Sequence, residues 1–510
     1  SGRQPVDRKV SINMDKQEAA RKLQELLGNS NTIGVMHSVV VELSKYIIIF
    51  LFAVYTWHCF TVFIGRDKER KERVYRHQLK LMFTIHFICS LVLFLNSLHV
   101  QIIILYLLQV VLFVFAGKAY PYVYEGMSKI VLNNMLMLLM VGMVMIERLD
   151  TGSAIRQMIF AAATCVTGLF IPYIIEKFSY FDIFGWFYAI AGLGLLALVF
   201  VIGEERYGAK NWVSIGSFAL QPSEFVKIIY VFFAAAFLAK AERFKDLVLV
   251  TAVAAAHVLI LVLEKDLGAA LIFYITYLVI LYVSTERLSY LLAGLACGSG
   301  AAVVAYHLFT HVQNRVIAWR DPWSTIANQG YQVAQSLFAF GTGGWFGMGL
   351  GEGMPDKIPV ASSDFIISAI GEELGVFFAI CVVLVEISCF VMFVNIALKM
   401  SRRFYKLTAL GLAVEFIFQV FLTVGGAVKF IPSTGVTLPL VSYGGSSVIS
   451  TIVLFSIIQG MYVLNREEAG EIEEKRKRKR RAEQEWETEE YETEGATRRR
   501  AKRTQRQERR

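Results

Sequence analysis

The stretch LVLVTAVAAAHVLILVLEKDLGAALIFYITYLVILYV (Leu247–Val283) consists of two apolar runs separated only by the charged triplet Glu264-Lys265-Asp266. Each run approaches the roughly 20 residues that cross the hydrocarbon core of a bilayer as a helix. Strands of a membrane β-barrel would be shorter and would alternate polar with apolar residues. The stretch therefore predicts two transmembrane helices joined by a tight turn.

The same pattern extends along the whole chain of 510 residues, of which 55% are hydrophobic and only 18% are charged. Soluble domains contain about 25% charged residues. In lipid, the backbone groups of separate apolar runs are satisfied only within helices. We therefore expect an all-α integral membrane protein, a polytopic bundle of about 13 transmembrane helices. The expected spans lie near 38–64, 80–97, 99–116, 128–146, 156–175, 184–203, 225–239, 246–263, 267–283, 289–309, 364–397, 405–424 and 446–464.

Basic residues predict the orientation of these spans, because short cytoplasmic loops are enriched in Lys and Arg. The three basic stretches are Arg66–Lys80, Lys399–Lys406 and Lys475–Arg481. With thirteen spans, all three lie on one side of the membrane. We expect that side to be cytoplasmic, with the N-terminus outside. The longer segments on the outer side are then Glu204–Gln221, 310–363 and Lys429–Gly445.

The two ends of the chain are predicted to lie outside the bundle. Met36 opens the first apolar run and is a plausible start, and residues 1–37 form an extension that we expect to be flexible and outside, with a short amphipathic helix at Asp15–Leu27. Residues 465–510 carry charges of both signs and almost no apolar side chains, so we expect a disordered cytoplasmic tail. Its basic blocks suit an anionic lipid surface. The formal charge of +9 therefore reports on topology rather than on nucleic acid.

Cysteines give no sign of a metal centre. The six cysteines all lie in apolar segments, without CxxC or CxxH spacing. Small buried side chains are the usual reading of such positions. We expect neither a metal site nor a disulfide framework.

Ionisable residues at membrane depth are costly and are therefore candidate functional residues. Glu224 and Lys227 lie three residues apart at the start of a helix that follows Pro222, so they share one face and can form an ion pair. An ordinary interfacial ion pair is the alternative interpretation. The turn at Glu264–Asp266 adds two carboxylates and a lysine on the predicted outer side, where a merely solvated turn is also possible.

Two glycine-rich segments also interrupt the apolar pattern. The run Gly347–Gly353 follows no predicted strand, so it is not a dinucleotide-binding fingerprint, and its glycines suit tight turns. Glu372 and Glu373 follow within an apolar helix. The segment Gly425–Ser447 breaks the helix between the last two spans, which is tolerated where protein or a water-filled cavity covers the backbone.

Four motifs carry a resemblance to a known family. They are QPSEFVK (221–227), GYQVAQSLFAFGTGGWFGMGLG (330–351), DFIISAIGEELG (364–375) and PLVSYGGSS (439–447). In this order and spacing they resemble the SEDS family of FtsW, RodA and SpoVE, over a ten-helix core at about 128–464. The phrase GMPDKIPVASSDFII is most similar to RodA-type members. Residues 38–127 then add three helices and the first basic loop to that core.

The resemblance implies a peptidoglycan glycosyltransferase that polymerises lipid II at the outer face of the bacterial cytoplasmic membrane, for cell shape, elongation or division. It also implies a class B penicillin-binding protein transpeptidase and membrane lipids as partners. A lipid-linked precursor transporter (flippase) and a non-catalytic scaffold for a transpeptidase are the alternatives. No cofactor is required by the sequence, although a divalent cation could neutralise the departing pyrophosphate.

The family pattern places an essential Asp where this chain has Thr325, and a threonine cannot act as a base near neutral pH. Asp321, four residues earlier, is the candidate base, with Asp266, Asp356 and Asp364 as rivals. We expect the Glu224–Lys227 pair to take part in catalysis and Lys429 to lie near the phosphates. Expected contacts to the substrate are Trp212, Gln221, Ser223, Asp266, Gln335, Ser336, Lys429, Ser442, Tyr443, Gly444, Gly445 and Ser446.

Overall fold

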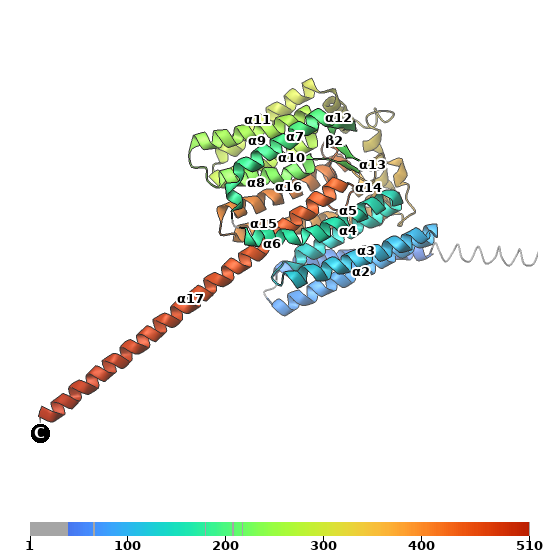
Figure 1. Cartoon of the computed structure of the whole chain (residues 1–510). Coiled ribbons are helices and arrows are strands. Elements are labelled where there is room, and N and C mark those ends of the chain that lie inside the picture. Colours follow the sequence, from blue (N-terminus) through green and yellow to red (C-terminus); the bar gives the residue numbers. More distant parts are fainter. Residues whose placement is uncertain (1–38, 65–66, 179, 207–208, 217, 509–510) are drawn as a thin grey trace, which may run out of the picture.

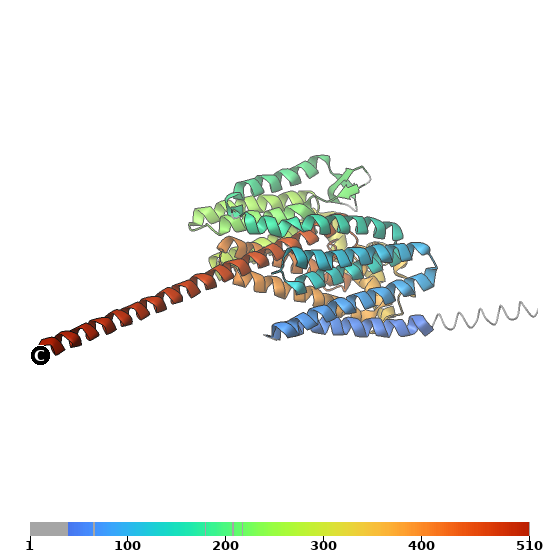
Figure 2. The same ribbon diagram turned by 60° about the horizontal axis from the view of Figure 1, so that its bottom comes forward.

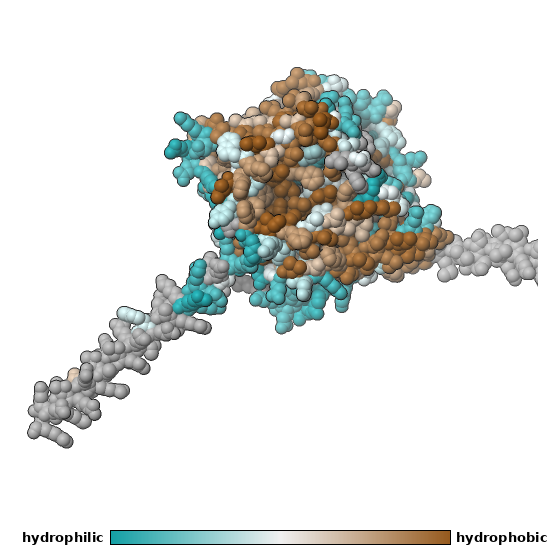
Figure 3. All heavy atoms as spheres, in the orientation of Figure 1, coloured by the Kyte–Doolittle hydropathy of each residue, from teal (hydrophilic) through white to brown (hydrophobic). Residues whose placement is uncertain are grey.

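A computed structural model describes residues 39–64, 67–178, 180–206, 209–216 and 218–508 (Figure 1). The predicted extension 1–37, with its amphipathic helix at Asp15–Leu27, lies outside the described residues. The described chain is a bundle of long helices, as the apolar pattern predicts. Figure 3 shows apolar residues along the helices and hydrophilic residues gathered at their ends, the distribution expected of a bundle in lipid.

Twelve helices in the described part of the chain are long and apolar enough to cross a membrane. The expectation of an all-α polytopic bundle is thereby confirmed, and the count of long helices is one fewer than the thirteen predicted. The twelve are the first span Val39–Ile64, α2 (Lys68–Ser97), α3 (Val100–Val123), α4 (Lys129–Leu149), Thr151–Lys177, which comprises α5 (Thr151–Gly168) and α6 (Phe170–Lys177), α7 (Gly185–Ile202), α9 (Phe244–Leu263), α10 (Leu267–Thr285), α11 (Leu288–Leu308), α15 (Gly375–Lys399), α16 (Arg403–Ala427) and the first part of α17, Gly445–Glu468.

The predicted span missing from these twelve is 225–239, which corresponds to α8 (Ser223–Leu238), a helix of only 16 residues. It runs antiparallel to α7, because its last turn packs against the first residue of α7: a Cβ on Gly185 would lie 2.9 Å from the ring of Phe237. A helix of this length spans about 24 Å. The helix is therefore shorter than a typical transmembrane helix, yet it connects the same two ends of the bundle as α7 does.

The bundle has two chemically different ends. At one end, called the loop end below, lie the helix α12 (Thr310–Arg320), α13 (Tyr331–Gly343), α14 (Ile366–Glu373) and a small sheet (Figure 1). At the opposite end α17 leaves the bundle (Figures 1 and 2). The three basic stretches lie at this second end. Helices α2 and α16 both begin there, and the tail extends from it away from the loop end.

The sheet was not foreseen by the all-α prediction. Strands β1 (Glu204–Arg206), β2 (Ala209–Ile215) and β3 (Phe218–Leu220) pair antiparallel in the order β1-β2-β3. The backbone N–H of Lys210 donates to the carbonyl oxygen of Glu264 at 3.0 Å. The segment between α7 and α8 is therefore folded and tied to the turn between α9 and α10.

The predicted span 364–397 is divided in the structure. Its first part is the short helix α14, and α15 begins at Gly375, which has a φ of +86°. A Cβ on Gly375 would lie 2.4 Å from the carbonyl oxygen of Trp345, so the chain turns where only glycine fits. Glu372 and Glu373 consequently end a short helix and do not lie within a long one. The outer loop 310–363 likewise contains α12, α13 and the single turn η2 (Pro355–Lys357).

Two segments predicted as irregular are helical. The basic stretch 66–80 forms the first turns of α2 from Lys68 onward, after Asp67 caps the helix by accepting from the N–H of Glu69 at 3.0 Å. The tail from 465 continues α17 as a helix as far as Glu508. Glu, Lys, Arg, Gln and Ala all have high helix propensity, and extending an existing helix avoids the cost of nucleation.

The centre of the bundle is α4, whose residues from Ile130 to Glu147 are all buried. Helices α2, α3, α5, α15 and α17 contact it from several sides. The three N-terminal helices therefore pack on the rest of the bundle through α4 and are part of one hydrophobic core.

Candidate functional site

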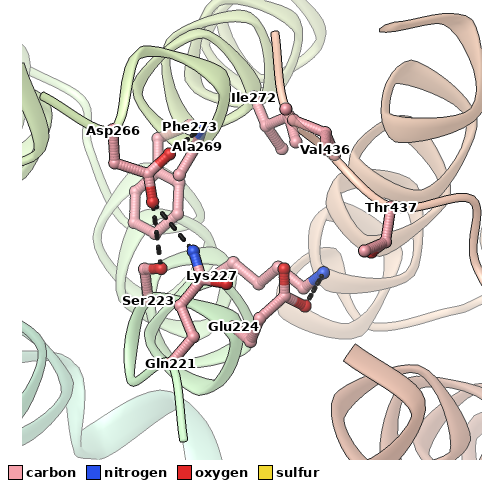
Figure 4. Close-up of a pocket in the computed structure, with 11 residues that line it drawn as sticks. Gln221, Ser223, Glu224, Lys227, Asp266, Ala269, Ile272, Phe273, Val436 and Thr437 are labelled. Atoms are coloured by element: carbon pink, nitrogen blue, oxygen red, sulfur yellow. Dashed lines mark hydrogen bonds and ion pairs between the residues drawn. The ribbon is translucent and has the colours of Figure 1, made fainter. Parts of the chain in front are cut away.

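A small cavity of about 30 Å³, lined by both polar and apolar side chains, lies between α8, α10 and the segment 435–437 near the loop end (Figure 4). Close approach of α10 to that segment depends on Gly268, where a Cβ would lie 2.4 Å from Val436. The lining residues are Gln221, Ser223, Glu224, Lys227, Asp266, Ala269, Ile272, Phe273, Gly435, Val436 and Thr437.

One wall of the cavity carries the ion pair predicted from the sequence. The Nζ of Lys227 lies 2.8 Å from the Oε2 of Glu224, and Ser450 donates to the same carboxylate oxygen at 3.0 Å. Lys227 is buried and Glu224 is half-buried. The pairing is thus confirmed, because the two residues stand three apart on one face of α8.

Helix α16 supplies partners of Lys227 that the sequence analysis missed. The ammonium donates to the Oε1 of Gln419 at 2.8 Å and lies 3.8 Å from the Oε1 of Glu415. Gln419 in turn donates to the carbonyl oxygen of Thr437 at 2.9 Å, which joins α16 to the cavity wall. The signal was present: Glu415 and Gln419 stand four apart in an otherwise apolar helix, so they share a face.

The opposite wall holds Asp266, which precedes α10. One carboxylate oxygen caps that helix by accepting from the N–H of Ala269 at 3.1 Å. The other accepts from Asn211 at 2.7 Å, from Gln221 at 3.0 Å and from Ser223 at 3.4 Å. A carboxylate with this many donors is held in one orientation. The prediction that Gln221, Ser223 and Asp266 lie together is confirmed; whether they bind substrate is a proposal.

Glu264 lies two residues away in a very different environment. Its side chain is buried, and neither carboxylate oxygen has a hydrogen-bond partner among the described residues. Burial, together with the nearby charge of Asp266, raises the pKa of Glu264 to about 8. Of the two interpretations of this turn, the solvated one is wrong for Glu264, because the β-sheet covers the turn.

An arginine and an aspartate lie beside the cavity at Gly435, which has a φ of +73°. A Cβ on Gly435 would lie 3.4 Å from the Nη2 of Arg315 and 3.6 Å from an Oδ2 of Asp364. Burial raises the pKa of Asp364 to about 6, although a Ser363 hydrogen bond and the charge of Arg315 oppose the rise. Burial lowers the pKa of Arg315, against the charges of Asp364 and Asp266. Arg315 was not among the predicted site residues, because nothing in the sequence of α12 relates it to the turn before α10.

The motif PLVSYGGSS packs behind the cavity wall on the side of α17, and its residues are not among those that line the cavity. Ser446 accepts from the backbone N–H of Gln221 at 2.8 Å, and Ser442 accepts from the N–H of Leu438 at 2.9 Å while donating to the carbonyl oxygen of Ser363. The N–H of Tyr443 donates to the carbonyl oxygen of Ser362 at 2.7 Å. Gly444 lies next to Thr437, and Gly445 lies against Phe160, where a Cβ would come within 2.7 Å of the ring. These residues shape the cavity chiefly through backbone contacts.

Other predicted contact residues lie away from the cavity wall. Ser336 is fully buried, and its hydroxyl joins α13 to Ser368 and to the carbonyl oxygen of Ala427, both at 2.6 Å. Its geometry is that of a packing contact. Trp212 on β2 and Gln335 on α13 are half-buried, and neither lines the cavity.

Asp321 and Thr325 also lie outside the cavity lining. Asp321 is exposed, and its Oδ1 accepts from the backbone N–H groups of Trp323 and Ser324, each at 3.2 Å. These hydrogen bonds lower its pKa, and the charge of Lys429 lowers it further. Thr325 donates to the carbonyl oxygen of Asp321 at 3.0 Å. At the loop end, Asp321 is therefore near enough to Lys429 to feel its charge. Glu224 and Lys227 line the cavity, whereas Asp321 does not.

The residues that match known proteins include the segments that form this cavity. The family model of the FtsW/RodA/SpoVE cell cycle proteins matches residues 127–467. The peptidoglycan glycosyltransferase RodA of Mycobacterium tuberculosis is 36% identical over 346 residues, which cover 62% of this chain and 74% of that protein. The probable peptidoglycan glycosyltransferase FtsW of Aliivibrio salmonicida is 33% identical over 304 residues, which cover 56% of this chain and 76% of that protein.

Two solved structures share the fold. One comes from work on the structural coordination of polymerization and crosslinking by a peptidoglycan synthase complex, with a TM-score of 0.57. The other is a variant of the Thermus thermophilus rod shape determining protein RodA, with a TM-score of 0.51. Each is 24% identical, and each match covers 68% of this chain and 99% of the other.

Proposed function

The chain belongs to the FtsW/RodA/SpoVE family of cell cycle proteins, and from this premise we propose that it is a peptidoglycan glycosyltransferase, which polymerises lipid II into glycan strands. The relatives matched over most of their own length carry that activity in their names. The single observation of this chain that best supports the proposal is the cavity containing Glu224, Lys227 and Asp266.

The chemistry of glycosyl transfer explains why such a cavity is suited to it. A carboxylate is needed to take a proton from the acceptor hydroxyl, and positive charge is needed where the pyrophosphate departs. Lys227 and Arg315 are the cations at or beside the cavity, and Lys429 lies at the same end of the bundle. Apolar surfaces along the helices of the bundle suit a polyprenyl chain in lipid (Figure 3). We assign the Glu224–Lys227 pair to catalysis and Gln221, Ser223 and Asp266 to substrate binding.

We keep Asp321 as the proposed base. Its lowered pKa leaves the carboxylate ionised at neutral pH, and it stands in the short loop where the family pattern has its acid. The hydrogen bonds that lower the pKa of Asp321 also make its carboxylate a weaker base, because basicity falls as the pKa falls. Movement of the loop that frees Asp321 from Trp323 and Ser324 would restore basicity and bring the carboxylate toward bound substrate.

The loop end is proposed to face the outside of the cytoplasmic membrane, where lipid II is polymerised. Support comes from the basic stretches, which lie at the other end of the bundle, as the positive-inside rule requires of a cytoplasmic side. A class B penicillin-binding protein transpeptidase is the proposed partner, since cross-linking must follow polymerisation. A structural relative was studied in a peptidoglycan synthase complex.

A second function, a non-catalytic scaffold for a transpeptidase, is favoured by one observation. Thr325 occupies the place of the family's acid, and its hydroxyl donates to the backbone of its own loop. A chain that had given up catalysis could keep the bundle and lose this carboxylate.

Purified protein incubated with lipid II, with and without its transpeptidase partner, tests the proposal. Glycan strands resolved by gel electrophoresis are the expected product, and their loss in a Glu224→Gln variant assigns the activity to this cavity. Absence of polymer in both conditions, from protein that is folded and binds the transpeptidase, would establish the scaffold instead.

A further inference from the structure

Three N-terminal helices, the first span, α2 and α3, lie outside the matched residues 127–467. The first span and α2 contact the loop end of the matched part. The Nζ of Lys45 in the first span donates to the carbonyl oxygen of Gly347 at 3.2 Å. The Nδ2 of Asn96 in the last turn of α2 donates to the carbonyl oxygen of Leu350 at 3.0 Å. Both acceptors belong to the segment Gly347–Gly353, called the glycine loop below.

The glycine loop has a backbone that only glycines adopt readily. Gly347, Gly349 and Gly351 have φ angles of +76°, +120° and +90°. A Cβ on Gly351 would lie 2.2 Å from the Nδ2 of Asn96, so α2 can approach the loop only because this residue is glycine. The amide of Asn96 and the bare backbone of Gly351 therefore fit each other.

On its other side the glycine loop is bonded to α14. The N–H groups of Met348 and Gly349 donate to the carbonyl oxygens of Glu372 and Glu373 at 3.0 and 2.9 Å. The N–H of Gly351 donates to the Oε2 of Glu373 at 3.0 Å, and Arg148 at the end of α4 pairs with the Oε1 of the same carboxylate at 3.0 Å. The loop thus lies between the added helices and α14.

From α14 the contacts continue to the cavity. Residues 362–364 lead directly into α14, and Ser362 and Ser363 accept from Tyr443 and Ser442. Ser442 also fixes the backbone of Leu438, one residue beyond the cavity-lining segment 435–437. Asp364 lies beside Gly435 in that segment. Displacement of the glycine loop would therefore move α14 and, with it, one wall of the cavity.

We propose that the first span and α2 clamp the glycine loop from outside the family core, and that Lys45 and Asn96 are positioning residues for glycosyl transfer. The inference rests on the proposed function for its catalytic part. Lys45 is suited to the task because it is buried and is also fixed by Glu42, which lies 2.8 Å from its Nζ. Misplacing reacting groups by about 1 Å can cost a hundredfold in rate.

The test compares Lys45→Met and Asn96→Ala with Lys129→Met, in full-length protein in lipid nanodiscs. Lys129 pairs with Glu72 at 2.7 Å and so joins the same helix α2 to α4 at the end far from the glycine loop. Hydrogen exchange of peptides covering 344–354 and the kcat of lipid II polymerisation are measured. We expect faster exchange and a fall in kcat of about tenfold, with KM little changed, in the first two variants only. Lys45→Arg should restore both readouts.

Three results would overturn the clamp. They are unchanged exchange in Lys45→Met and Asn96→Ala, an equal rise in exchange in Lys129→Met, and faster exchange with an unchanged kcat. If the wild-type protein makes no polymer, the proposed function fails. The exchange comparison still decides then whether the added helices hold the loop.

Discussion

Glu264 and Asp266 are two carboxylates separated by one residue, and their surroundings give them opposite properties. Asp266 accepts four hydrogen bonds, whereas the oxygens of Glu264 accept none from the described residues. A buried carboxylate without donors keeps its proton, because the charged form loses solvation and gains nothing in return. The turn at the cavity therefore carries one carboxylate held by four hydrogen bonds and one buried carboxyl whose pKa is raised to about 8.

Replacing Glu264 with Gln should stabilise the protein at alkaline pH. The folded state holds the proton up to a pKa of about 8, while the unfolded chain releases it near 4.5. Between these values the folded state binds more protons, so the wild-type protein loses stability as pH rises from about 4.5 to about 8. Glu264→Gln removes this loss. Thermal unfolding in detergent should give a Tm raised by a few degrees at pH 8.5 and unchanged at pH 4.5. A lower Tm at pH 8.5 would mean that the charged form is stabilised.

The base is tested by comparing Asp321→Asn with Thr325→Asp in the polymerisation assay. If Asp321 takes the proton, Asp321→Asn should lower kcat by about a hundredfold or more, the usual contribution of a general base. Ser324→Ala is the matched control, because it changes the same loop without removing a carboxylate. Full activity of Asp321→Asn would reject this residue as the base. A large gain from Thr325→Asp, in a wild-type protein of low activity, would indicate that catalysis has been given up.

At the scale of elements, α8 and α16 are joined by one buried lysine between two carboxylates. Lys227→Met leaves Glu224 and Glu415 facing each other without a cation, which should destabilise the protein by about 3–5 kcal/mol. Adding Glu415→Gln should recover part of that stability but no activity, since the cation at the cavity is still absent. Tm and polymerisation are measured on both variants. Equal stability of wild-type and Lys227→Met protein would show that the pair is solvated.

Helices were predicted well from the sequence where apolar residues form a continuous run. They were predicted poorly where a single glycine determines the end of a helix. Continuous apolar runs specify membrane helices regardless of their neighbours, which explains the agreement over nearly all spans. The break at Gly375 depends on a contact with Trp345, thirty residues away, and no local pattern shows it. The ion pair on α8 was predictable because Glu224 and Lys227 are neighbours on one helix. Arg315 was not, because it reaches the cavity from another element.

At the scale of the whole molecule, the four motifs identified the family, and the match over residues 127–467 confirms it. Motifs far apart in the chain meet in the structure, since 221–227 and 439–447 contact each other through Gln221 and Ser446. The tail continues α17 as a helix, because low hydrophobicity excludes a packed core but does not exclude a single continuing helix. Hydropathy describes what a segment can bury, and helix propensity acts independently of it.

The topology of the chain in the membrane depends on whether α8 crosses it. If this helix of 16 residues crosses the membrane, the turn between α8 and α9 lies on the same side as the tail. Single cysteines at Lys357, Glu242 and Lys475, in a background with the exposed Cys297 changed to Ser, report the side of each position. An impermeant thiol reagent applied to intact cells should label Lys357→Cys alone, and permeabilised cells should show all three. Labelling of Glu242→Cys together with Lys357→Cys would mean that α8 turns back within the membrane. Under the positive-inside rule the basic tail is expected inside the cell. Labelling of Lys475→Cys in intact cells would therefore show that the orientation is the opposite of the one proposed.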